Sequence, residues 1–503
     1  MIFKPASQID SKTEKNFFIE QINVYIRLVQ CFCEKYCIKF TDFPGVPIEE
    51  ELKKIGVLDN SSELPELKKI LGESYHTFEI AVKLAVLNKK SMGGLLDRLY
   101  NSKRKEIQRK AAQKKGRTLV DFFCGAGGLS LGFLQEGFHV KLANDIEDVC
   151  IQTYKYNHPE LPGDKLIQGD IKQIIDHIED YIKEEIDIVV GGPPCQGFSE
   201  ANRQRVIDDP RNKLYKYFIQ AVEKIVPRFV VMENVKGMLK VADQVVEDYE
   251  TLKIKKNGQV YSYKVGYRVL NSQNFSVAQS RERLIYIAVR NDIIREKNIT
   301  PEEIFVQIEE NCKNNRQYVL QDALNDLKAL EAPRIKNVNE VDSDVTGKKI
   351  DINTFENNGN AYLNLINEGR KIPYVYNHKA RYVSDVNYEI YRRLNQGDDA
   401  TDEKIADIMP YAHRNHCFKD KYYKLYADRP CRTITAHLRM DCHSHIHPAQ
   451  IRALTPREAA RVQSFPDDYL FWGAYLKTYM QIGNAVPPLM ARGIAEIIKK
   501  YLE

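Results

Sequence analysis

Short apolar runs alternate with helical stretches between residues 118 and 235, and this alternation constrains the fold more than any other feature of the chain. The runs that we expect to be strands read TLVDFF, HVKLAND, KLIQGD, IDIVVGG and RFVVMENV. Strands that alternate with helices form a parallel sheet covered by helices on both faces. Two later runs, YSYKVGYRVLN and ERLIYIAVR, predict an antiparallel pair that completes the sheet. The sequence therefore predicts an α/β fold.

The segments on either side of this alternation follow other patterns. Residues 1 to about 100 space their apolar side chains three and four apart, which is typical of amphipathic helices. Residues 102–117 carry eight Lys or Arg against one Glu, and they predict either a solvated connector or a basic helix whose charge suits phosphate contact. Beyond residue 292 the chain is polar and irregular until helical patterns return. We therefore expect four segments, 1–116, 117–291, 292–440 and 441–503.

The composition narrows the class of protein. The chain has 503 residues, 43% of them hydrophobic, which is enough for a large core. No stretch approaches the roughly 18 uninterrupted apolar residues of a membrane helix, and the N-terminus lacks the apolar core of a signal peptide. Ten cysteines are scattered without a paired framework, which predicts free thiols. We therefore expect a cytoplasmic protein without a membrane partner, and its net charge of +5 permits a polyanionic one.

A glycine-rich turn, DFFCGAGG from Asp121 to Gly128, joins the first strand to the helix that follows. Glycines there let backbone N–H groups approach a ligand at the N-terminus of a helix. The next strand ends in Asp145, where an acid is placed to bind ribose hydroxyls, and Asp170 ends the third strand. Ser130 replaces the third glycine of the dinucleotide pattern, so an adenosine ligand without a pyrophosphate fits better than NAD. A tight turn without any nucleotide is the alternative.

A single thiol follows the GGPP turn at the end of the fourth strand. Cys195 would face the crevice in which open α/β sheets bind their ligands. Glu233 ends the fifth strand, and Arg281 and Arg283 begin another. A thiol, a carboxyl and guanidinium groups are side chains that nucleophilic and acid–base catalysis uses. The alternatives are that Cys195 is a buried structural cysteine, that Glu233 is a surface or helix-capping acid, and that Arg281 and Arg283 form salt bridges within a pair of strands.

The motifs, taken in their order, resemble those of the cytosine-5 DNA methyltransferase family. The matching blocks are DFFCGAGGLSLGF, NDIE, GDI, GGPPCQGFS, MENVKGML, QSRERLIYIAV, LTPREAARVQSFPDDYLF and QIGNAVPP. The resemblance does not reach the first 115 or so residues and is weak across about 292–430. It implies a class I S-adenosylmethionine-dependent methyltransferase fold, in which a Rossmann-like mixed sheet carries helices on both faces. A smaller, irregular target-recognition domain at 292–440 and an N-terminal helical extension would complete the chain.

The resemblance also implies residue roles. Cys195 would be the nucleophile and Glu233 the acid at N3 of the base, while Arg283 would hold the base carbonyl with Arg281 beside it. S-adenosylmethionine is the expected cofactor. The residues expected to bind it are Phe123, Gly125, Gly127, Gly128, Asp145, Ile146, Asp170, Ile171, Pro194, Asn484 and Val486. The residues expected at DNA are Ser199, Arg203, Gln204, Arg211 and Thr433.

The chemistry of cytosine explains why these groups are needed. Carbon 5 is too weak a nucleophile to accept a methyl group from a sulfonium, and addition of a thiolate at carbon 6 makes it enamine-like. The base lies inside a duplex stack and must be flipped out. The implied function is methylation of cytosine in a specific double-stranded DNA sequence by a bacterial, nucleoid-associated monomer. A restriction–modification system would supply a cognate restriction endonuclease that acts on the same site. A tRNA cytosine-5 methyltransferase and a non-catalytic DNA-binding relative are the alternatives.

Two clusters resemble metal sites without predicting one. Cys31, Cys33 and Cys37 lack a fourth ligand nearby in the sequence. His443, His445 and His447 alternate as residues of a strand do. We therefore expect no metal.

Overall fold

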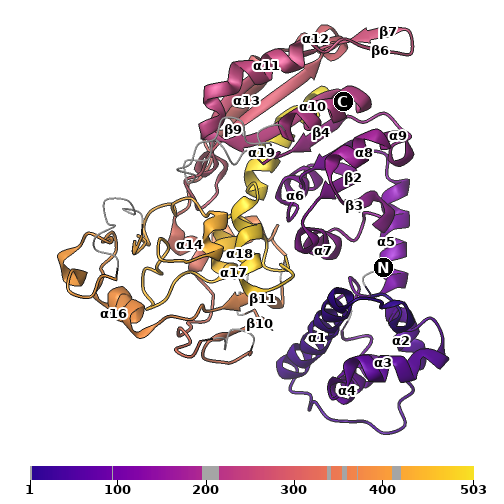
Figure 1. Cartoon of the computed structure of the whole chain (residues 1–503), viewed down its shortest axis with the longest axis vertical. Coiled ribbons are helices and arrows are strands. Elements are labelled where there is room, and N and C mark those ends of the chain that lie inside the picture. The colour runs from indigo at the N-terminus through magenta and orange to yellow at the C-terminus, as the bar shows by residue number, and fades with distance from the viewer. Residues whose placement is uncertain are drawn as a thin grey trace.

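A seven-stranded mixed sheet forms the centre of the catalytic region (Figure 1). Its order is β3-β2-β1-β4-β5-β9-β8. The strands are β1 (Arg117–Phe122), β2 (Phe138–Asp145), β3 (Leu166–Gln168), β4 (Ile188–Gly191), β5 (Phe229–Val235), β8 (Tyr263–Asn271) and β9 (Glu282–Arg290). Strands β1 to β5 run parallel, β9 runs antiparallel to β5, and β8 runs antiparallel to β9. The predicted strands and the closing antiparallel pair are confirmed.

The computed structural model describes most of the chain. The described residues are 3–92, 94–194, 214–336, 341–353, 359–370, 372–410 and 421–503. Among their helices, none combines the length and apolar character that a membrane span requires.

Successive side chains of the strands enter two separate cores, because side chains alternate between the faces of a sheet. Ile188 and Val190 of β4 pack in one core, and Val189 packs in the other. The first face is covered by α6 (Gly128–Gln135), α7 (Asp148–Asn157), α13 (Pro301–Cys312) and α19 (Pro488–Ile498). The second is covered by α8 (Ile171–Asp176), α10 (Leu214–Ile225) and α11 (Ala242–Glu250). Helices on both faces match the predicted fold class.

The N-terminal region is helical, as its periodicity predicts. Its helices are α1 (Lys12–Lys35), α2 (Glu49–Ile55), α3 (Leu64–Leu71), α4 (Ser74–Leu87) and α5 (Asn101–Gln113). The basic stretch forms α5, and one face of this helix is docked. Arg104 is 4% exposed and donates a 2.7 Å hydrogen bond to the carbonyl oxygen of Lys155 in α7. Of the two alternatives for this stretch, the structure favours the helix over the connector.

The region from 292 to 440 begins with helices that lie against the sheet. Helix α12 (Asn291–Lys297) follows β9, and α13 packs against β8 and α19. Beyond them, β10 (Gly347–Ile352) and β11 (Tyr374–Lys379) form an antiparallel ribbon. Three short helices accompany it: α14 (Leu320–Leu324), α15 (Ala361–Ile366) and α16 (Asp385–Arg393). The division of the chain into four domains stays a prediction.

The C-terminal residues return to the sheet. Helix α17 (Pro456–Val462) starts with a capping box in which Thr455 and Glu458 bind each other's backbone N–H groups, with Pro456 at the first helical position. Helix α18 (Tyr475–Asn484) follows, and α19 then packs on α6. Helix α19, near the C-terminus, therefore lies beside α6, the helix that follows the glycine-rich turn.

Candidate active site

A buried ion pair marks the carboxyl end of β5. Oε1 of Glu233 lies 2.9 Å from Nε of Arg283, and the two side chains are 11% and 13% exposed. The antiparallel register of β5 and β9 sets Val235 opposite Arg283, which brings the two side chains together. Burial lowers the pKa of Arg283, and the charge of Glu233 opposes that shift. The pair offers a carboxyl and N–H donors side by side, which suits the edge of a planar polar ring.

The GGPP turn lies directly against this pair. A side chain at Gly191 would overlap the carbonyl oxygen of Phe122, and a Cβ at Gly192 would lie 3.0 Å from Oε2 of Glu233. Asn234 donates a 2.9 Å hydrogen bond from Nδ2 to the carbonyl oxygen of Pro193. The glycines are thus required by close approach, and the segment after Glu233 holds the turn in place.

The described part of this turn ends at the exposed Pro194. Several predicted residues lie outside the described residues: Cys195, Ser199, Arg203, Gln204 and Arg211.

The buried side chain of Arg281 links its own segment to two others through hydrogen bonds. It is 1% exposed and donates from Nη1 to the carbonyl oxygen of Ile434 at 2.6 Å and from Nη2 to that of Gly483 at 2.9 Å. Burial lowers its pKa, and the neighbouring charge of Arg283 lowers it further. Both terminal nitrogens therefore bind main chain, so Arg281 positions β9 against α18 and the 431–434 segment.

Thr433 belongs to that same segment. Its hydroxyl donates a 3.0 Å hydrogen bond to the carbonyl oxygen of Ser280, the residue before Arg281. The structure thus places Thr433 beside the entry to β9, half-buried.

The glycine-rich turn after β1 is shaped by its neighbours. Gly127 has φ +87°, a left-handed conformation that favours glycine, and a side chain at Gly128 would overlap the carbonyl oxygen of Val486. The N–H of Gly125 donates to Oδ2 of Asp145 at 2.9 Å, and the N–H of Glu147 donates to Oδ1 of the same residue at 2.8 Å. Burial raises the pKa of Asp145. This acid thus organises the loop on which a ligand would lie.

The other predicted cofactor residues gather at the same edge of the sheet. Phe123 and Ile146 follow the adjacent ends of β1 and β2, and Ile146 is 66% exposed. Asp170 caps α8 by accepting a 3.0 Å hydrogen bond from the N–H of Lys172. Asn484 is exposed at the end of α18.

Ile171 and Val486 have buried side chains, 2% and 5% exposed, and both pack in the cores on the two faces of the sheet. Only their main chain is available to a ligand. The arrangement combines an exposed apolar side chain, carboxylates and backbone N–H groups, and can hold a ligand of the adenosine type.

The sequence predicts no role for Asp121, the first residue of the DFFCGAGG segment. It is fully buried under the glycine-rich turn and accepts a 2.6 Å hydrogen bond from Oγ of Ser130, which in turn accepts one from the hydroxyl of Tyr154 at 2.7 Å. Burial raises the pKa of Asp121 to about 7. Ser130, the residue that replaces the third glycine, therefore anchors α6 to β1.

Buried arginines organise the block around α17. Arg461 pairs with Asp467 at 2.6 Å, and Arg452 pairs with Glu458 at 2.6 Å, with all four side chains 0–2% exposed. Arg457 donates to the carbonyl oxygens of Tyr376 at 2.6 Å and Pro466 at 2.8 Å. Arg457 and Arg461, four positions apart on one face of α17, were the available sequence signal for this network.

His445 and His447 of the histidine cluster are buried, as are Cys31 and Cys33 of the cysteine cluster, whereas Cys37 is exposed. His443 stacks on Tyr422 with ring centroids 4.5 Å apart and shares a 2.8 Å hydrogen bond with the hydroxyl of Tyr391. Burial lowers the pKa of His443 to about 4 and that of His445 to about 3. Within the described ranges no group of three or more His, Cys, Asp or Glu is arranged to hold a metal ion.

Comparisons with known proteins identify the family to which this chain belongs. The family model for C-5 cytosine-specific DNA methylase matches residues 117–500. The chain is 32% identical over 394 residues to Type II methyltransferase M1.HphI of Haemophilus parahaemolyticus, an alignment that covers 76% of this chain and 87% of that protein. It is 31% identical over 405 residues to Type II methyltransferase M.DdeI of Desulfomicrobium norvegicum, covering 76% and 89%.

A solved structure shares the fold. A prophage-encoded E. coli protein assigned as a DNA modification methyltransferase superposes with a TM-score of 0.58 at 25% identity and covers 77% of this chain and 99% of its own. The predicted class I methyltransferase fold is thereby confirmed. The N-terminal helices α1 to α5 lie outside the matched residues. The match from 117 to 500 spans about three quarters of the sequence, and the chain belongs to the C-5 cytosine-specific DNA methylase family.

Proposed function

We propose that the chain transfers a methyl group from S-adenosylmethionine to carbon 5 of a flipped-out cytosine in a specific double-stranded DNA sequence. DNA cytosine methylation follows from the family. The proposal adds the cofactor, the residues and the covalent route. The observation that carries it is the Glu233–Arg283 pair, 2.9 Å apart and beside the turn that leads to Cys195.

The edge formed by β1 and β2 fits S-adenosylmethionine. A Cβ at Gly125 would have no atom within 4 Å, so the turn is open to a ligand there, and the exposed Ile146 offers an apolar surface to a flat ring. Phe123 and Ile146 would flank the adenine, Asp145 would bind the ribose and Asp170 the adenine amino group. The exposed end of α18 would close the pocket, with Asn484 and the main chain of Val486. Bound there, the cofactor supplies a methyl group carried on a positively charged sulfur.

The residues of the chain would act on the cytosine ring in turn. The thiolate of Cys195 forms a bond to carbon 6, and the electron pair of the 5,6 double bond becomes available at carbon 5. Glu233, which takes up a proton from solvent as the base enters, delivers that proton to N3, so that no negative charge accumulates on the ring, and Arg283 donates hydrogen bonds to O2. Once carbon 5 carries the methyl group, a base removes its proton, the thiolate leaves, and N3 returns its proton to Glu233.

The biological setting is part of the proposal. The relatives at about 30% identity bear the name Type II methyltransferase. We infer a bacterial modification enzyme that protects its sequence from a cognate restriction endonuclease. Double-stranded DNA as substrate places the enzyme in the cytoplasm at the nucleoid, and one chain carries all the groups that the route needs, so it acts as a monomer.

Trapping on DNA that contains 5-fluorocytosine tests the covalent route. Fluorine at carbon 5 cannot leave as a proton, so the enzyme remains bonded to the base and migrates as a protein–DNA adduct. Bisulfite sequencing of DNA from expressing cells first identifies the site. The Cys195→Ser variant should bind S-adenosylmethionine and form no adduct. Adduct formation by that variant, or none by the wild type on DNA with the identified site, would contradict the proposal.

A further inference from the structure

The N-terminal helices share their hydrophobic core with the rest of the chain. The core of α1 to α4 also contains Tyr156 of α7, Ile350 of β10, Tyr374 and Tyr376 of β11, and Leu470 and Trp472 between α17 and α18. Trp472 is 1% exposed, and its ring centroid lies 5.6 Å from that of Phe17 in α1 and 5.6 Å from that of Tyr156. The N-terminal region is therefore docked through a common apolar core, although the family match begins only after it.

The β10–β11 ribbon lies between this region and α17, beside the N-terminal helices in Figure 1. On one side, Nε of Arg457 donates to the carbonyl oxygen of Tyr376 at 2.6 Å. On the other, Nε of Arg27 in α1 donates to the carbonyl oxygen of Ile350 at 3.0 Å, and Lys349 pairs with Glu20. A two-stranded ribbon is marginally stable by itself and needs a packing partner. Helix α1 packs against the ribbon on one side, and α17 packs against it on the other.

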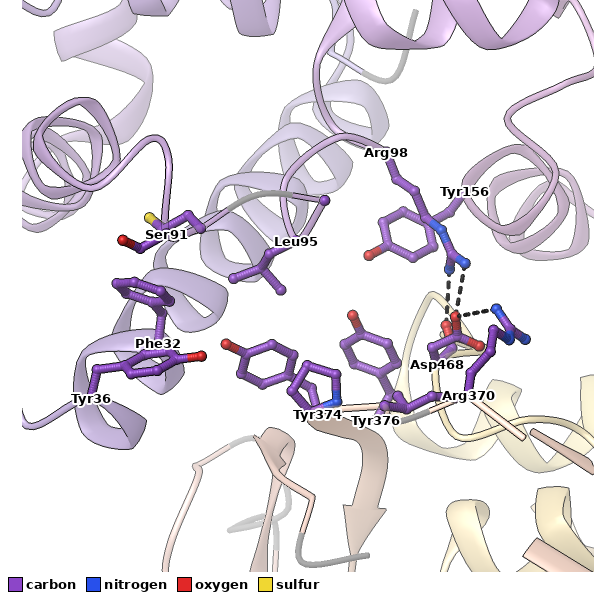
Figure 2. A pocket seen from close by; sticks show the side chains of 14 residues that line it. Phe32, Tyr36, Ser91, Leu95, Arg98, Tyr156, Arg370, Tyr374, Tyr376 and Asp468 are labelled. Carbon is purple, nitrogen blue, oxygen red and sulfur yellow. Dashed lines mark hydrogen bonds and ion pairs between the residues drawn. The ribbon is translucent and has the colours of Figure 1, made fainter. Parts of the chain in front are cut away.

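Arg98 provides a polar connection at the same junction. Its Nη1 donates to the carbonyl oxygen of Asp468 at 3.0 Å, and its Nη2 donates to Oδ2 of Asp468 at 2.9 Å. Nη1 of Arg370, which precedes β11, lies 3.4 Å from that same Oδ2. Figure 2 shows both guanidinium groups directed at Asp468, at one end of a cavity of about 290 Å³ that Phe32, Tyr374 and Tyr376 help to line. One carboxylate thus joins the N-terminal region to the segment that leads into the ribbon.

Asp468 lies in a segment that also contacts the cofactor edge. Its neighbour Asp467 pairs with Arg461 of α17. Its other neighbour, Tyr469, donates its hydroxyl hydrogen bond to the carbonyl oxygen of Ala126 in the glycine-rich turn. These two contacts hold the segment to the catalytic region without Arg98. Loss of Arg98 would consequently unlink the N-terminal region from Asp468 and from Arg370 beside the ribbon, while the glycine-rich turn stays supported.

We propose that the N-terminal helices are a positioning element for DNA recognition, and that Arg98 acts through Asp468 and Arg370 to hold the β10–β11 ribbon in a fixed orientation. The inference rests on the proposed function in one respect, that the 292–440 region reads the DNA. A recognition region that is held before DNA arrives avoids an ordering cost on binding, so its release weakens DNA affinity. Methyl transfer at the bound site and cofactor affinity do not depend on this support.

The test compares Arg98→Gln, Arg370→Gln and Arg98→Lys with the control Arg268→Gln, which removes an exposed ion pair between β8 and Glu309. KM and equilibrium affinity are measured on a duplex that carries the site identified by bisulfite sequencing, alongside kcat and the affinity for S-adenosylmethionine. Arg98→Gln and Arg370→Gln should each raise KM and Kd for DNA about tenfold, the effect of losing a charged hydrogen bond. The double variant should be no weaker than either single one, because both act through one carboxylate. Arg98→Lys should restore part of the affinity, and Arg268→Gln should match the wild type.

A fall in kcat or in cofactor affinity with unchanged DNA affinity would overturn the inference, as would wild-type DNA affinity in both glutamine variants. Trp472 is the only tryptophan of the chain, so its emission reports on docking separately from turnover. A red shift in Arg98→Gln together with weaker DNA binding supports the inference, and a red shift with unchanged DNA binding contradicts it. If the wild type methylated no DNA, the proposed function would fail, and equilibrium affinities for duplex DNA of mixed sequence would still decide the role of Arg98.

Discussion

Glu233 and Arg283 form an ion pair of 2.9 Å across antiparallel neighbours, β5 and β9, although fifty positions separate them in the sequence. The pair lies beside Gly192, whose missing side chain leaves room for the carboxylate. A base that entered this site would meet an acid and a fixed hydrogen-bond donor at adjacent atoms. This relationship gives the two residues separable contributions to the reaction.

Glu233→Gln should lower kcat by about 100-fold or more, because an amide cannot deliver a proton to N3 and general acid catalysis contributes at least that much. Single-turnover methyl incorporation measures the effect, and affinity for S-adenosylmethionine should not change. Glu282→Gln is the matched control, since Glu282 pairs with Lys236 at the surface with both side chains 48% exposed. A Glu233→Gln enzyme with a rate within about threefold of the wild type would rule out Glu233 as the acid.

Asn234→Ala should slow adduct formation about fivefold by releasing the carbonyl oxygen of Pro193, since one hydrogen bond is worth about 1 kcal/mol. The turn before Cys195 then loses its fixed geometry. The rate of trapping on 5-fluorocytosine DNA is the measurement. Asn315→Ala removes a hydrogen bond of the same kind at the surface, to the carbonyl oxygen of Asn274, and should leave the rate unchanged. Equal rates in the two variants would show that the turn does not need Asn234.

The strands and helices of the sheet could be predicted because their pattern is local. Ile188, Val189 and Val190 are all apolar, which indicates burial on both faces, and each predicted strand from residue 118 to 235 is found at its expected place. The gathering of Asp145 and Asp170 at one edge of the sheet could be predicted in the same way, since parallel strands end together, Asp145 ends β2 and Asp170 follows β3.

The long-range polar contacts could not be predicted from the sequence. Arg98 and Asp468 are 370 positions apart, and nothing local in either segment indicates that they meet. Arg281 was expected beside Arg283, and nothing in its own segment indicates that its guanidinium binds the main chain of Ile434 and Gly483. Which arginine meets a ligand and which ties segments together depends on burial, and burial is decided by tertiary packing.

Gly128→Ala should weaken binding of S-adenosylmethionine and lower the midpoint of thermal unfolding, because the added methyl group would overlap the carbonyl oxygen of Val486. Separating α6 from the start of α19 is an overpacking change that costs about 1–3 kcal/mol. Gly163→Ala is the control, since a Cβ there would have no atom within 4 Å. Calorimetric titration with S-adenosylmethionine and thermal unfolding give the two readouts. Unchanged cofactor affinity in Gly128→Ala would separate this contact from the binding site.

Asp467→Asn should destabilise the protein by about 3–5 kcal/mol at neutral pH, because it leaves the guanidinium of Arg461 buried without its counter-charge. Burial by itself would raise the pKa of Asp467, and the adjacent Arg461 overrides it, so the pKa is lowered from its usual value. A carboxyl whose pKa is lower in the folded state stabilises fully above the unfolded pKa of about 3.9, and the contribution is lost as the pH falls through the folded pKa.

The difference in urea midpoint between wild type and Asp467→Asn should therefore be constant from pH 7 to about pH 5 and should shrink below about pH 4. Asp407→Asn provides the comparison, because Asp407 is 63% exposed in its ion pair with Arg393 and its loss should shift the midpoint little at any of these pH values. A difference for Asp467→Asn that grew on acidification would mean that the carboxyl is protonated in the folded protein, and the buried pair would then not be ionic.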